Sequence, residues 1–98
     1  MRSDQIVDYI QKFNDLCQEM GIRKNNSIPT NIKGTWNNWS SLMFYANAEI
    51  VSAHHQGTTA SYVGASKKQA RLEEFVRELT VAMAKLGFAG EYDWEAYH

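Results

Sequence analysis

Cysteine and long apolar runs are nearly absent from this sequence of 98 residues. Cys17 is the only cysteine, so neither an intrachain disulfide nor a zinc site built from cysteines can form. No run has the roughly 20 consecutive apolar residues that a membrane-spanning helix needs, and the first residues lack the pattern of a secretory signal. We therefore expect a cytoplasmic protein, in a compartment that keeps thiols reduced.

An excess of charge of either sign is also absent. The 10 basic and 11 acidic side chains give a formal net charge of −1. A protein that coats nucleic acid without sequence specificity needs a broad positive electrostatic field. The nearly neutral net charge therefore argues against this class of protein, although local basic patches remain. The apolar share of 44% and the charged share of 21% are typical of a globular chain. The length predicts a single helical domain over residues 1–98.

Motifs that carry catalysis or bind cofactors are missing as well. We find no Ser-His-Asp arrangement, phosphate-binding glycine loop, dinucleotide-binding glycine pattern or zinc-protease helix. His54 and His55 are adjacent, so on a helix they point about 100° apart and cannot readily share a metal ion. We therefore predict no enzyme activity, no metal site and no cofactor. The two histidines are interpreted as residues of a last helical turn, with His54 alternatively an interior residue.

Apolar residues recur at three- and four-residue steps in three stretches, which is typical of amphipathic helices. The helices are predicted at about 3–20, 35–56 and 66–86. The first and third are predicted to end at Gly21 and Gly87, each of which is followed by an apolar residue. The pattern predicts an all-α three-helix bundle with a long first connection and a short aromatic C-terminal tail.

The second predicted helix is apolar around much of its circumference. Thr35 is its expected N-cap. One face carries Trp36, Trp39, Leu42, Met43, Ala46, Ile50 and Ala53, and Phe44, Ala48 and Val51 widen it. Glu49 is the only formal charge between Gly34 and Ser66. A helix this apolar is normally covered on more than one side, so we predict self-association through it into a homo-oligomer.

The predicted start of the third helix is cationic. Ser66 with Gln69 forms a capping-box pattern after a small, hydroxyl-rich loop over 57–65. Lys67, Lys68 and Arg71 stand in the first predicted turns, although the helix dipole disfavours cations there. Cations beside the free amides of a helix start are typical of a phosphate-binding site. The candidate phosphate-binding residues are Ser66, Lys67, Lys68 and Arg71, with Tyr62 as a stacking surface. Solvated lysines, or lysines paired with acids elsewhere, explain the pattern equally well.

Two further segments are candidates for partner binding. The tail over 89–98 alternates acids with aromatic side chains, which either close one end of the bundle's own core or contact a partner. The polar, basic connection over 23–34 is either a spacer or a binding loop. The candidate partner-binding residues are Trp94, Tyr97, Tyr92, Arg23, Lys24 and Lys33.

These patterns together favour a non-catalytic interaction protein. We expect it to bind a macromolecular partner, most simply another protein, and to inhibit or adapt that partner. Phage and mobile-element accessory proteins, including anti-defence proteins, are often small stand-alone domains of this kind. The alternative is a phosphate-recognising module that binds a nucleotide or a nucleic acid through the cationic start of the third helix.

Overall fold

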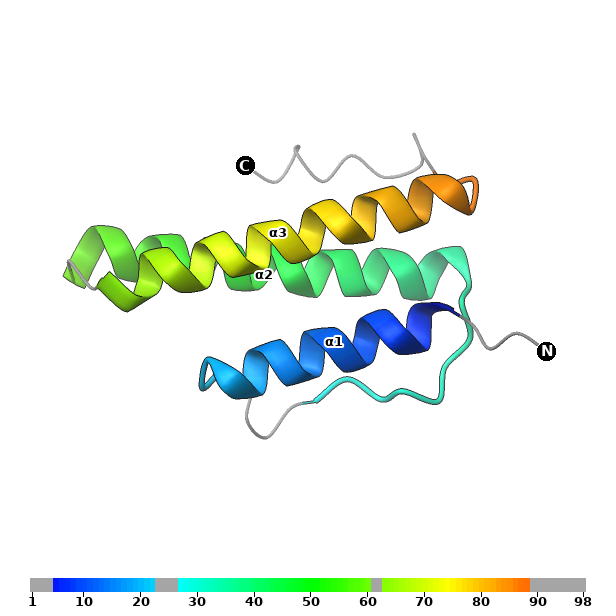
Figure 1. The fold of residues 1–98 in the computed structure, drawn as a ribbon, viewed down its shortest axis with the longest axis horizontal. Helices are drawn as coiled ribbons and strands as arrows, with labels where there is room; N and C mark the ends of the chain where they lie inside the picture. The colour runs from blue at the N-terminus through cyan, green and yellow to red at the C-terminus, as the bar shows by residue number, and fades with distance from the viewer. Residues whose placement is uncertain (1–4, 23–26, 61–62, 89–98) are drawn as a thin grey trace. The chain divides into compact units, whose positions relative to one another are not determined.

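The described part of the chain forms three α-helices and no β-strand. The computed structural model describes residues 5–22, 27–60 and 63–88, and side chains in the same ranges except 56–60 and 63–66. Helix α1 covers Gln5–Glu19, α2 covers Trp36–Ala60 and α3 covers Val63–Lys85 (Figure 1). The all-α class and the three helices predicted from the sequence are confirmed.

The chain divides into two compact units, Met1–Leu42 and Met43–His98. The boundary lies inside α2, so the first two turns of this helix belong to the first unit and the rest belongs to the second. The single domain predicted from the sequence stays a prediction.

In the first unit, α1 packs against the start of α2. The buried residues of α1 recur at four- and three-residue steps, as expected for an amphipathic helix: Ile6, Ile10, Phe13 and Cys17. The apolar spacing of the sequence also placed Tyr9, Leu16 and Met20 on this stripe, and these three are half-buried. The rings of Tyr9 and Trp39 lie 5.6 Å apart at a tilt of 56°, and Trp39 is buried. A tilted pair at this spacing adds about 0.5–1.5 kcal/mol to the gain from burial alone.

The connection between α1 and α2 is held to α1 by one side chain. Asn14 donates a hydrogen bond from Nδ2 to the carbonyl oxygen of Ile28 (2.8 Å), and its Oδ1 accepts one from the Ile28 amide (3.0 Å). Ile28 is buried, so its backbone has little access to water. The amide of Asn14 therefore satisfies both polar groups of a residue that anchors the connection.

Thr35 caps the start of α2, as predicted. Its Oγ1 accepts a hydrogen bond from the Asn38 amide at 3.3 Å. Asn38 also donates from Nδ2 to the carbonyl oxygen of Lys33 at 2.7 Å. These bonds satisfy one unpaired amide of the first turn and join the preceding segment to the helix.

Helices α1 and α3 end in the same way, which the glycine-then-apolar pattern predicted. Gly21 has a φ of 74° and Gly87 a φ of 89°. The Ile22 amide donates to the carbonyl oxygen of Cys17 (2.8 Å), and the Phe88 amide donates to that of Met83 (2.9 Å). These bonds and positive φ values form Schellman caps, for which glycine is favoured because it has no Cβ.

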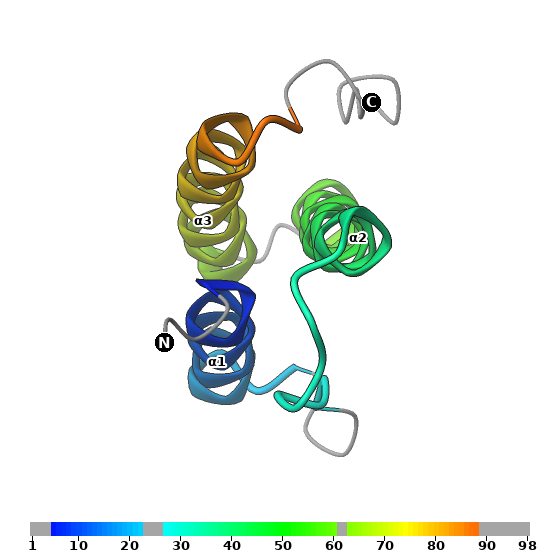
Figure 2. The ribbon, with the colours of Figure 1, turned by 90° about the vertical axis from the view of Figure 1, so that its right-hand side faces the viewer.

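In the second unit, α2 from residue 43 onward and α3 run antiparallel, side by side (Figures 1 and 2). Their buried side chains recur at helical spacing and come from both helices. They are Met43, Ala46, Ile50, Ala53, Leu72, Phe75, Val76, Leu79, Ala82 and Met83.

The predicted loop over 57–65 is wrong. Helix α2 continues to Ala60 and α3 begins at Val63, so only two residues separate them. Ser66 therefore lies inside α3, and its capping box with Gln69 does not mark the helix start. Threonine, serine and glycine cost at most about 1 kcal/mol each inside a helix. Because that cost is small, packing of the flanking turns can extend both helices through a segment of turn-like composition.

Candidate interaction surface

The predicted partner-binding residues fall mostly outside the described part of the chain. The structure does not describe five of them: Trp94, Tyr97, Tyr92, Arg23 and Lys24. Lys33 is described and has an exposed side chain in the segment before α2. These assignments stay predictions.

The predicted phosphate-binding residues lie deeper in α3 than the sequence suggested. Lys67 and Arg71 are exposed and Lys68 is half-buried. The orphan amides of a helix belong to its first turn, which begins at Val63. The three cations therefore stand on the second and third turns, and Lys67 and Arg71 share a face at four-residue spacing. Tyr62 and the side chain of Ser66 lie outside the described residues.

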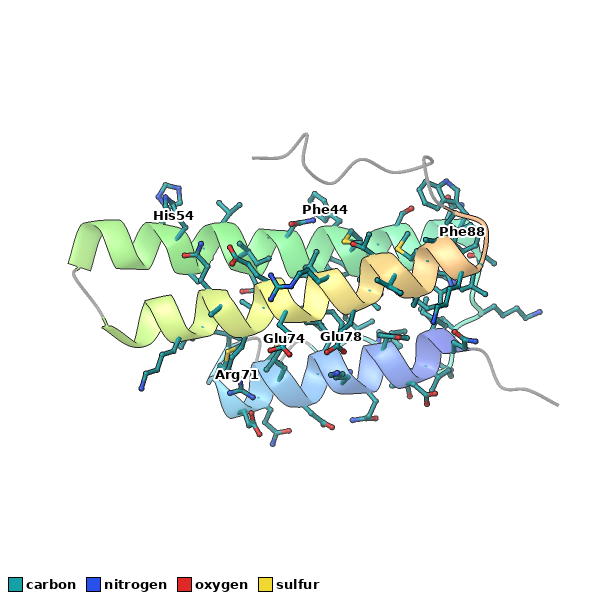
Figure 3. All side chains as sticks on the ribbon, turned by 45° about the horizontal axis from the view of Figure 1, so that its top comes forward. Phe44, His54, Arg71, Glu74, Glu78 and Phe88 are labelled. Atoms are coloured by element: carbon teal, nitrogen blue, oxygen red, sulfur yellow. The ribbon has the colours of Figure 1, made fainter. Side chains whose placement is uncertain are left out.

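His54 is neither an interior residue nor part of the last turn. It is exposed and precedes the end of α2 by six residues, because α2 continues to Ala60. Figure 3 shows its ring directed away from the helix pair. Within the described residues, no group of three His, Cys, Asp or Glu side chains is placed to hold a metal ion.

The described surface with the clearest chemical character is an apolar stripe on α2. Phe44 is 49% exposed, Val51 is 40% exposed, and Ala48 between them is also exposed. With 3.6 residues per turn, the three positions fall within about 60° of the helix circumference and cover about 10 Å of its length. We call these three residues the α2 stripe.

The α2 stripe is uncharged over its whole length. Glu49 is the only acid in α2, and it lies about 140° around the helix from Phe44. Tyr45 is 37% exposed beside the stripe, and its ring lies 6.1 Å from that of Phe44. The stripe therefore presents contiguous apolar and aromatic surface with no ionised group on it. Contiguous exposed apolar surface is typical of interaction sites.

Val81 on α3 provides a contrast. It is 54% exposed, which is more than Val51. Its neighbours at four-residue spacing are Arg77 and Lys85, so it stands alone among charged side chains. A scattered apolar residue of this kind is normal on a soluble surface. Exposure alone therefore does not distinguish the α2 stripe. The lack of charge and the continuity over about two turns distinguish it.

One buried polar group in α2 was not predicted from the sequence. Asn47 is 3% exposed, and its Nδ2 donates to the carbonyl oxygen of Met43 at 3.3 Å. Its Oδ1 is buried, and no described residue donates a hydrogen bond to it. A buried acceptor of this kind costs about 1–3 kcal/mol. One feature of the sequence could have indicated this buried amide. Asn47 is the only amide side chain between Trp39 and His54, in a helix that is apolar around much of its circumference.

No protein-family model, curated protein or solved structure matches this chain. Among the described residues, no helix combines the length and the apolar character needed to cross a membrane.

Proposed function

We propose that this chain is a non-catalytic interaction protein of the cytoplasm, and that it binds a protein partner and modulates it as an inhibitor or adaptor would. The observation that carries the proposal is the uncharged α2 stripe of Phe44, Ala48 and Val51. An apolar helix face of another protein fits this surface, since the stripe follows one side of a helix at the spacing used in helix–helix packing.

The stripe can supply a useful part of a binding energy. Burying a phenylalanine or valine side chain fully contributes about 1.5–3 kcal/mol. About half of the Phe44 side chain and two fifths of the Val51 side chain are still exposed. Burying the exposed parts of both side chains is therefore worth about 1.4–2.7 kcal/mol in total. A complete interface needs further contacts, and the tail aromatics, the basic connection and self-association through α2 remain our proposals for them.

Affinity capture with matched variants tests this function. Val51→Glu places a charge in the middle of the stripe, whereas Val81→Glu places the same charge on a face that already carries Arg77 and Lys85. We expect the partner, identified by mass spectrometry and reconstituted from purified components, to lose at least tenfold in affinity with Val51→Glu and to bind Val81→Glu normally. Equal affinity of the two variants would contradict the use of the stripe.

The phosphate alternative predicts a different result. Binding through Lys67 and Lys68 would weaken steeply with salt and collapse in the double variant Lys67→Glu/Lys68→Glu. It would also bring a nucleotide or nucleic acid into the captured fraction. We expect little salt dependence and full binding by the double variant, because apolar contacts dominate the stripe. Light scattering over a concentration series tests self-association, and a strict monomer would overturn that part of the proposal.

A further inference from the structure

We draw no further inference here: the strongest candidate, the exposed and uncharged α2 stripe of Phe44, Ala48 and Val51 as a docking face for a second copy of the chain, belongs to the surface already described, and nothing in the structure shows what covers it.

Discussion

The hydrogen bonds between Asn14 and Ile28 give the sharpest prediction about stability. Asn14 is on α1 and Ile28 is on the connection 14 residues later, so one side chain anchors this segment in the first unit. Asn14→Ala removes both bonds. Each hydrogen bond contributes about 1 kcal/mol net, and alanine returns about 0.5 kcal/mol of helix propensity. We therefore expect a loss of about 1.5 kcal/mol in the free energy of unfolding.

Urea denaturation measures this loss, and amide hydrogen exchange locates it. The Ile28 amide donates to Asn14 Oδ1 at 3.0 Å, so its exchange should accelerate on the order of tenfold in the variant. The matched control is Gln11→Ala on the same helix. Gln11 donates to Asp15 across one exposed turn at 3.0 Å, which is worth only a few tenths of a kcal/mol. Equal stability losses from the two variants, or unchanged exchange at Ile28, would refute the anchoring role of Asn14.

Three further substitutions test the helix ends and the buried amide. Gly21→Ala and Gly87→Ala should each cost about 1 kcal/mol in thermal or urea unfolding, because alanine is strained at positive φ; no loss at either site would contradict the caps. Thr35→Ala should cost about 1 kcal/mol and Thr35→Ser almost nothing, since serine keeps the capping oxygen. Asn47→Leu should leave the melting temperature unchanged or raise it, because it removes a buried acceptor to which no described residue donates; a clear fall would contradict this expectation.

The features that could be predicted from the sequence are those that depend on residues close together in the chain, such as helix caps and the buried face of one helix. Glycine at a left-handed position, followed by an apolar residue, ended α1 and α3 where the pattern indicated. Thr35 capped α2, and the apolar spacing of α1 included all four of its buried residues, although three other residues of the stripe are only half-buried. In each case the energy that decides the outcome lies within one or two turns of the chain. Sequence therefore carries the information directly.

The segment around Gly57 shows where the same reasoning fails. Serine, threonine and glycine suit loops and helix starts, yet they also continue a helix at modest cost. The choice between the two is made by the apolar residues on either side, among them Ala53 and Leu72, which are buried. Their packing spans two helices and cannot be counted within a window of sequence. The early start of α3 at Val63 then moved the cations away from the helix end, which was the main premise for a phosphate site.

The candidate surface could be predicted only in part for a related reason. The sequence showed that α2 is apolar on more sides than one face requires, and it grouped Phe44, Ala48 and Val51 correctly. It could not show which apolar residues the chain covers by itself, because the buried face and the widening residues have the same composition. Burial separates them: Ala46 is fully buried, while Ala48, two residues later, is exposed. An alanine is found equally in buried and in exposed positions, so the larger neighbours of Ala48, Phe44 and Val51, give this surface its character as an interaction site. Of these two, Val51 is the better site for an introduced charge, because Val81 supplies a still more exposed valine on a charged face for comparison.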